Sequence, residues 1–460
     1  MKKCFTRLAA FTISLYSLSA TAQEEPTLEE RITQLENRLS ETETENDEEE
    51  KEYVPSLNNV AYNDSFFNPQ IALFLDLKME HYQIEPEDYT IPGFTIGGEG
   101  GLGSQGFSTA GTELNLNSTI NDQFFGNVTL ALHDHGGESV EVDLEEAYVE
   151  TTSLPYGFTA IGGRFFSDIG YLNNKHPHVW DFADAPLVYT AMLGQQLFDD
   201  GARLSWVAPT DLFIEFGSEV FRGSSYPASG DADGGFGTKS LFVNFGGDVG
   251  GSHSWLLGIS QLWADAIDRQ GNGGHSHDDD GGHDHATGFE EGHGDEVVPS
   301  EFTGDNDITI IDFVWKWAPN GNPDINYAIF QAEYFYGIQD GDITIFNEEH
   351  GHDHSSTLDG TQQGFYVQGL YQFIPRWRVG ARYDLLWSDN TGSNEHVLEK
   401  AGLESDGFKP TRWSGMLDYS YTENSIFRVQ YNADRSTPEL DNQVFFQVLM
   451  NFGAHGAHQY

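Results

Sequence analysis

Cysteine is almost absent from this chain, because Cys4 is the only one among 460 residues. It lies in the N-terminal stretch MKKCFTRLAAFTISLYSLSATAQ, in which basic residues precede a short apolar run and small residues offer a cleavage point after Ala22. This pattern is typical of a secretory signal peptide, and we expect residues 1–22 to be removed on export. The mature chain would then have no thiol, which excludes disulfides, thiolate metal sites and cysteine nucleophiles.

Long apolar runs and basic residues are also scarce. No segment after residue 22 is apolar over the length of a membrane-spanning helix, which excludes helical spanning but not a barrel. Of the 22 Lys and Arg, three belong to the signal, and the remaining 19 face 73 acidic residues, so the net charge is about −54. This charge excludes nucleic acid as a partner and attracts cations, although an acidic surface that is merely solvated has the same composition.

Two short segments follow the signal. In residues 23–45, Leu28, Ile32, Leu35 and Leu39 recur in steps of four and three. This spacing predicts a periplasmic coiled-coil helix that helps to form a homotrimer, and a simple amphipathic linker helix is the alternative. Residues 46–67 begin with NDEEEKE, which carries charge without apolar content and predicts an acidic linker.

From residue 68 to residue 460 apolar and polar residues alternate with a period of two, as in QIALFLDLKMEHYQI. This predicts an all-β fold, a transmembrane outer-membrane β-barrel of about 16 antiparallel strands. After the first strand, the predicted strands cover 106–120, 122–133, 139–152, 156–166, 199–208, 210–222, 238–249, 252–265, 306–318, 323–338, 363–374, 375–388, 411–422, 424–434 and 441–452.

The connections distinguish a barrel from a soluble β-sandwich, which would alternate in the same way. Tight turns are predicted at 120–122, 153–157, 208–210, near 250, and at 318–324, 374–376 and 422–424, with long loops between them. Such alternation places all tight turns at one rim, as the periplasmic turns of outer-membrane barrels require. The last strand, NQVFFQVLMNF, ends on an aromatic residue as terminal barrel strands do, and GAHGAHQY follows it.

Histidines are concentrated at the rim of the long loops. They form four clusters: His133 and His135; His176 and His178; His275, His277, His283, His285 and His293; and His350, His352 and His354. Neutral imidazole combined with carboxylate suits zinc, and also nickel or copper. Spacings such as H-x-H do not close one tetrahedral site, so we expect several weak, exchangeable sites. For any single pair the alternative is a solvated polar loop.

The pair His176 and His178 differs from the other clusters. Trp180, Phe182 and neighbouring prolines predict an ordered loop that folds into the lumen. There a packed, hydrogen-bonded pair of histidines is as good an interpretation as a metal site.

The block GRFFSDIGYLNNKHPHVWDFADAPLVYTAMLGQQLFDDGARLSWVAPTD (163–211) and the tail GAHGAHQY resemble a family of proteobacterial proteins called zinc-regulated outer-membrane receptors. The resemblance covers most of the mature chain. The order of coiled coil and barrel is also similar to that of phosphate-selective porins. The resemblance implies an outer-membrane protein that is expressed under zinc limitation and aids zinc entry.

The size of the chain indicates passive transport. A TonB-dependent receptor needs a 22-stranded barrel and a globular plug, and about 390 barrel residues leave room for neither. We find no plug domain. The candidate lumen residues are mostly acidic, which favours cations. They are Asp76, Glu80, Glu141, Asp143, Glu145, Asp312 and Asp384, with Lys78, Arg164, Arg382 and Arg428 in the minority.

The sequence therefore predicts a porin-like channel in the outer-membrane lipid that concentrates and passes divalent cations, zinc first. A surface barrel that does not transport, and acts as a metal buffer or adhesin, is the alternative. An outer-membrane hydrolase is a third class, but no serine motif supports an enzyme.

Overall fold

The computed structural model describes residues 69–97, 100–109, 111–134, 140–228, 235–271, 297–346 and 354–453. The predicted signal peptide, coiled-coil helix and linker, and the tail after residue 453, lie outside the described residues. Within the described ranges, no helix is long and apolar enough to cross a membrane.

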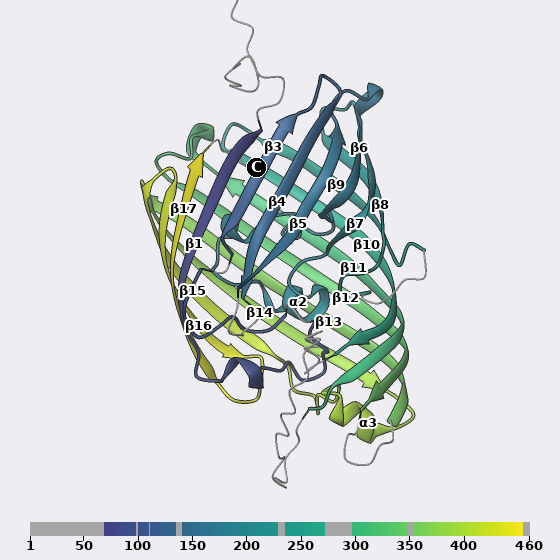
Figure 1. Ribbon diagram of the computed structural model, residues 1–460. Coiled ribbons are helices and arrows are strands. Elements are labelled where there is room, and N and C mark those ends of the chain that lie inside the picture. Colours follow the sequence, from purple (N-terminus) through teal and green to yellow (C-terminus); the bar gives the residue numbers. More distant parts are fainter. Residues whose placement is uncertain are drawn as a thin grey trace, which may run out of the picture. The chain divides into compact units, whose positions relative to one another are not determined.

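A single antiparallel sheet forms the barrel (Figure 1). Its strands are β1 (Gln70–His81), β2 (Gly106–Ser108), β3 (Glu113–Thr119), β4 (Phe124–Asp134), β5 (Val140–Thr151), β6 (Phe158–Phe166), β7 (Phe198–Val207), β8 (Phe213–Phe221), β9 (Thr238–Val249), β10 (His253–Gln270), β11 (Ser300–Trp317), β12 (Tyr327–Ile345), β13 (His354–Ile374), β14 (Trp377–Thr391), β15 (Thr411–Thr422), β16 (Ser425–Arg435) and β17 (Asp441–Gly453).

The sheet closes because β1 pairs with β17 as well as with β2 and β3. The short β2 pairs with β1 at Lys78–Glu80 and β3 pairs with it at Gln70–Phe74, so β2 and β3 share one position in the wall. The barrel thus has 16 strand positions, and the predicted fold class and strand number are confirmed. The helical segments are short: η1 (Pro86–Asp88), η2 (Pro155–Gly157), η3 (Pro177–Val179), α2 (Leu187–Leu193), η4 (Pro319–Gly321) and α3 (Glu395–Lys400).

The predicted tight turns all join the strands at one rim, where β17 also ends (Figure 1). Two details of the prediction were wrong. The connection 436–440 at the opposite rim is short rather than long. Four strands also extend further than predicted towards that rim: β10 to Gln270, β11 from Ser300, β12 to Ile345 and β13 from His354. The first residue of β13 is therefore His354, which was predicted to lie in a loop.

The outer surface of the wall is apolar. In β17, Val444, Phe446, Val448, Met450 and Phe452 face outwards as predicted, while the residues between them are largely buried. Large outward side chains on other strands, among them Ile71, Phe216, Ile259 and Val429, are also more than a third exposed. An apolar belt of this kind matches the hydrocarbon of a membrane.

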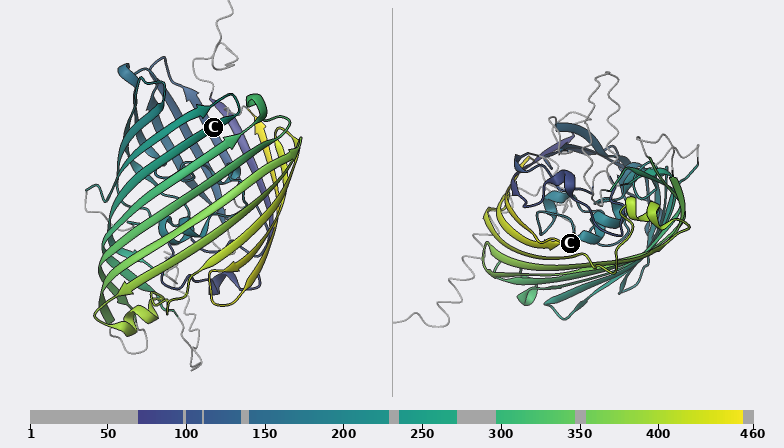
Figure 2. Two further views of the ribbon diagram at one scale, coloured as in Figure 1. Left: turned by 180° about the vertical axis from the view of Figure 1, so that it is seen from behind. Right: turned by 90° about the horizontal axis from the view of Figure 1, so that it is seen from below.

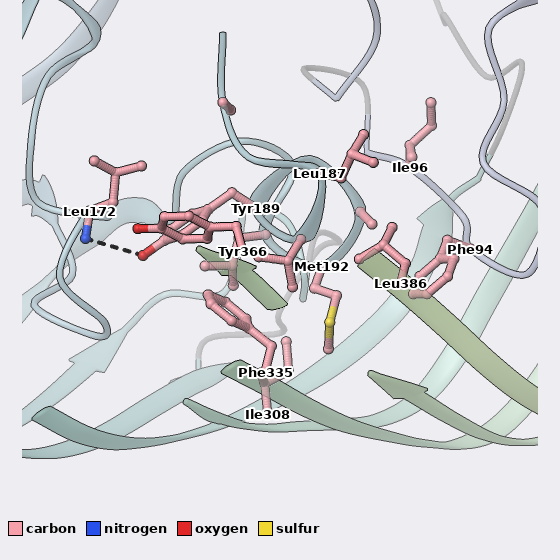
Figure 3. Close-up of a cluster of buried hydrophobic side chains, with 14 of the residues drawn as sticks. Phe94, Ile96, Leu172, Leu187, Tyr189, Met192, Ile308, Phe335, Tyr366 and Leu386 are labelled. Atoms are coloured by element: carbon pink, nitrogen blue, oxygen red, sulfur yellow. Dashed lines mark hydrogen bonds between the residues drawn. The ribbon is translucent and has the colours of Figure 1, made fainter. Parts of the chain in front are cut away.

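Loops of the barrel itself fill much of its interior (Figure 2). The described parts of the connection between β1 and β2, 82–97 and 100–105, and the connection 167–197 fold inwards, and every residue of α2 is buried. They meet wall residues such as Leu262, Ile308, Phe335 and Leu386 in one hydrophobic cluster. Figure 3 shows Tyr189 and Met192 of α2 beside Phe335 and Ile308. The centre of the lumen is therefore an apolar core.

The inward loop 167–197 is anchored to two strands of the wall, β12 and β14, which both pair with β13. The Glu333 carboxylate on β12 accepts hydrogen bonds from the Tyr171 and Leu172 amides at 3.0 and 3.2 Å. On β14, Asp384 accepts one from the Leu187 amide at 2.9 Å. Buried polar groups that accept several backbone amides hold a loop firmly, because releasing them would leave the carboxylates unsatisfied.

Candidate metal centre

Three elements bring carboxylates and imidazoles together beside the apolar core. Glu113 begins β3, Glu145 and Glu146 lie on β5, and His176 and His178 flank the start of η3 in the inward loop. The two histidines are therefore in the lumen, as the sequence analysis expected for an ordered loop.

Local hydrogen bonds fix the segment that carries the histidines. The Asn173 side chain donates to the carbonyls of Ser167 and Leu197, both at 2.8 Å, and so ties the two ends of the loop together. The Trp180 indole N–H donates to the Lys175 carbonyl at 2.7 Å. Pro177 restricts the backbone between the two histidines, because its φ is fixed by the ring.

A β-bulge places two consecutive glutamates on one face of β5. In the ladder with β4, Thr129 pairs with Glu146 and the next residue, Leu130, pairs with Leu144. Glu145 is thus the extra residue, and both it and Glu146 face the lumen. In a regular strand one of the two would face lipid, because side chains alternate.

The side chains converge within hydrogen-bonding distance. The Nδ1 of His178 lies 2.9 Å from Glu113 Oε1, and the Nδ1 of His176 lies 3.0 Å from Glu113 Oε2 and 3.2 Å from Glu145 Oε2. The other ring nitrogen of His176, Nε2, lies 3.0 Å from Glu146 Oε2. Glu113, His176 and His178 each offer a ligand atom within 4.8 Å of the others, as a metal ion requires.

Aromatic rings set the planes of both imidazoles. Phe74 stacks on His178 with ring centroids 3.8 Å apart, and Phe166 meets His176 edge-on at 4.9 Å. The Glu113 side chain is 2% exposed and the His176 side chain 18%. The centre is therefore held rigidly but can be reached from one side.

Two buried atoms of the centre lack a satisfactory hydrogen bond. Among the described residues, neither Glu113 Oε2 nor His176 Nδ1 has a partner in hydrogen-bond geometry, although the two lie 3.0 Å apart. Burial lowers the pKa of His176, but the Glu113 and Glu146 carboxylates outweigh it and raise that pKa well above its usual range. The centre thus attracts positive charge, which either a proton or a metal cation can supply.

The other predicted histidines are not part of this centre among the described residues. His133 is the penultimate residue of β4, at the strand end where it was expected. His354 is exposed at the start of β13. His135, His275, His277, His283, His285, His293, His350 and His352 lie outside the described residues.

Sequence reasoning missed Glu113 and Glu146 as members of the centre. The consecutive glutamates in DLEEAY interrupt the alternation of β5, and this was the available signal. Nothing in the sequence indicated Glu113, which reaches the histidines only through the fold of the inward loop.

Another part of the wall, strands β14–β16, carries four arginines that are paired with carboxylates. Arg382 contacts Asp184 and Asp384 at 2.9 and 3.0 Å. Similar ion pairs join Arg412 to Asp184 and Asp434, Arg378 to Asp181 and Asp418, and Arg428 to Asp418. These pairs neutralise a row of positive charge that would otherwise attract anions.

Comparison with known proteins relates this chain to others. No family model matches the sequence. An uncharacterized protein of Aquifex aeolicus (strain VF5) is 30% identical over 424 residues, which cover 86% of this chain and 80% of that protein. The chain belongs to the same family as this Aquifex protein.

The fold is similar to that of a solved outer membrane channel. The outer membrane channel DcaP of Acinetobacter baumannii is 11% identical, with a TM-score of 0.50 over 84% of this chain and 97% of DcaP. A loop L8 deletion mutant of OmpT from Vibrio cholerae is 12% identical, with a TM-score of 0.49 over 84% of this chain and 99% of that one. With its closed 16-strand barrel and apolar outer belt, the protein is a porin-like barrel of the outer membrane.

Proposed function

We propose that this barrel takes up divalent metal cations, zinc first, and that Glu113, His176 and His178 bind the ion on its way through the lumen. The observation that carries the proposal is the convergence of Glu113 Oε2 and His176 Nδ1 without a hydrogen bond between them. When His176 Nδ1 is deprotonated, two buried atoms with lone pairs lie 3.0 Å apart, and a metal cation that both can coordinate would stabilise them.

The set of ligands suits zinc. Two imidazoles and one carboxylate form a common zinc site with a position left for water or another ligand, and Glu145 lies near enough to provide one. Without thiolates such a site exchanges its ion more readily, as transport requires. The resemblance of residues 163–211 to zinc-regulated outer-membrane proteins supports zinc over other divalent metals.

Charge in the lumen supports a preference for cations. On the β14–β16 wall the arginines are paired with carboxylates, whereas on the β3–β5 side Glu113, Glu145 and Glu146 face histidines. A wall with surplus carboxylate selects cations. The histidine-rich segments at the loop rim would collect metal outside the barrel, and residues 23–45 would join three barrels into a homotrimer.

The apolar core favours a second candidate function. The cluster around α2 occupies the centre of the lumen, so a barrel that holds metal at the surface without passing it is also consistent with the fold. Both functions share the metal centre and differ only in transport.

Titration calorimetry with zinc tests the metal centre. We expect the purified barrel to bind one zinc ion more tightly than the weak loop sites, and the double variant His176→Ala/His178→Ala to lose that ion. The control is His396→Ala, because His396 is 66% exposed on α3. Identical titrations of the wild type and the double variant, both folded by heat-modifiable gel migration, would refute the proposed centre.

A further inference from the structure

Glu146 is placed to orient a ligand of the metal centre rather than to bind the metal. Its Oε2 accepts hydrogen bonds from Asn127 Nδ2 and Thr129 Oγ1, both at 2.9 Å, and lies 3.0 Å from His176 Nε2. Asn127 and Thr129 are buried. This carboxylate oxygen thus has three polar neighbours. Asn127 and Thr129 donate hydrogen bonds to it, and the role of His176 depends on its tautomer.

The amide of Asn127 is itself held in one orientation. Asn115 Nδ2 donates to Asn127 Oδ1 at 2.8 Å, and Asn117 Nδ2 donates to Asn115 Oδ1 at 2.7 Å. With its oxygen occupied, Asn127 presents its NH2 group to Glu146. This chain of side chains on β3 and β4 keeps Glu146 in the role of an acceptor.

We propose that Glu146 is a positioning residue that fixes the tautomer of His176. This inference rests on the proposed metal centre. Glu146 is an acceptor and lies in hydrogen-bond geometry with Nε2, whereas Nδ1 has no partner in such geometry among the described residues. In a neutral ring the proton is therefore on Nε2, and Nδ1 keeps its lone pair. The Nδ1 atom lies 3.0 Å from Glu113 Oε2 and 3.2 Å from Glu145 Oε2, where a cation relieves the repulsion between the lone pairs. Carboxylates commonly orient metal-binding histidines in this way.

The bulge in β5 makes this division of roles possible. By turning Glu145 and Glu146 to the same face, it places one carboxylate beside each nitrogen of the His176 ring. Glu145 then lies on the metal side of the ring, and Glu146 on the side away from the metal.

Three variants distinguish a positioning residue from a ligand. Glu146→Gln keeps the size of the side chain and one acceptor oxygen but removes the charge. Glu113→Gln alters a proposed ligand. Glu150→Gln, four residues along β5, removes a carboxylate that also faces the lumen, and controls for the general loss of negative charge. The readouts are the zinc affinity by calorimetry and the visible absorption of bound cobalt(II), which reports the ligands around the metal.

We expect Glu146→Gln to weaken zinc binding by about 10- to 100-fold while the cobalt spectrum keeps its wild-type shape. Glu113→Gln should change the shape of the spectrum, and Glu150→Gln should bind like the wild type. Wild-type affinity in Glu146→Gln would refute the positioning role, and a spectral change like that of Glu113→Gln would make Glu146 a ligand. If the wild type binds no zinc, the proposed metal centre itself is refuted. This outcome can be distinguished from failure of the positioning role, in which the wild type and Glu146→Gln bind zinc equally.

Discussion

At the scale of single residues, the centre brings carboxylate oxygens and imidazole nitrogens so close together that their lone pairs repel unless a cation lies between them. His176 has carboxylate oxygens beside both of its ring nitrogens, and Glu113 lies between two imidazoles. A proton can satisfy this arrangement as well as a metal can. If the centre binds a metal as proposed, proton and metal compete for the same position, and metal binding releases protons.

Zinc binding at the centre should weaken as the pH falls, and should do so at a higher pH than in the loops. The Glu113 and Glu146 carboxylates outweigh burial and raise the pKa of His176, so its proton already competes above the usual value of about 6.5. Below its pKa, affinity should fall by about tenfold per pH unit for each proton displaced. Ordinary loop histidines should lose zinc only nearer pH 5.

Calorimetry between pH 8.5 and 5, repeated in buffers with different ionisation enthalpies, measures both affinity and proton release. The double variant His176→Ala/His178→Ala isolates the contribution of the loops. A tight site whose affinity does not change between pH 8.5 and 6.5 would contradict proton competition at His176.

At the scale of elements, the proposed metal centre depends on the loop 167–197, which is held inside the barrel. Glu333, which is 1% exposed, accepts from two backbone amides of the loop and from the hydroxyls of Tyr189 and Tyr366 at 2.8 and 2.5 Å. Asn173 ties the ends of the loop together. The histidines are thus positioned by anchors that contact neither imidazole.

Glu333→Gln should loosen the loop without opening the barrel. The NH2 group of the glutamine would face the amide and hydroxyl donors that now bind the carboxylate. Leaving a buried donor unsatisfied typically lowers stability by about 1–3 kcal/mol. We expect faster hydrogen exchange at the Tyr171 and Leu172 amides and weaker zinc binding, with unchanged exchange in β10–β13. Glu301→Gln on β11 is the control, since Glu301 contacts the exposed Gln270 instead. Unchanged exchange at residues 171–172 would show that Glu333 is not an anchor.

Strand positions could be predicted from the sequence where the strands cross lipid, because apolar residues must alternate there. The prediction failed at the outer ends of β10–β13, where outward positions such as Asp305 and Asp307 contact solvent. The hydrogen-bonded ladder continues there, but the apolar alternation that marks it does not. The sequence did not predict that the lumen is filled, because inward apolar residues such as Ile308 and Ile310 have the same pattern as those of any buried strand.

Of the proposed metal centre, the sequence predicted the two histidines but not the carboxylates. His176 and His178 were candidates because histidines two apart near aromatic residues are visible in sequence. Glu113 and Glu146 lie on β3 and β5 and reach the histidines through the inward fold of the loop 167–197 and the bulge at Glu145. Of these two features, only the bulge has a local signal, which is the pair of consecutive glutamates in DLEEAY.

At the scale of the whole molecule, the family and the barrel are established, while assembly and transport are proposals. If residues 23–45 form a trimeric coiled coil, deletion of residues 23–52 should weaken the oligomer and leave the barrel folded. Native gels measure the oligomer, and heat-modifiable migration measures the fold. Trimers that persist after the deletion would show that the segment is only a tether.

Zinc flux into liposomes tests whether the barrel passes zinc through its lumen. Vesicles that contain the purified barrel and a trapped zinc-sensitive dye are mixed with zinc, with potassium conductance in planar bilayers as a control for an open lumen. The account predicts zinc entry through the wild type, slower entry through His176→Ala/His178→Ala, and a cation-selective conductance in both. A barrel that binds zinc at the centre but passes neither zinc nor potassium would contradict uptake and make the protein a surface barrel that stores metal.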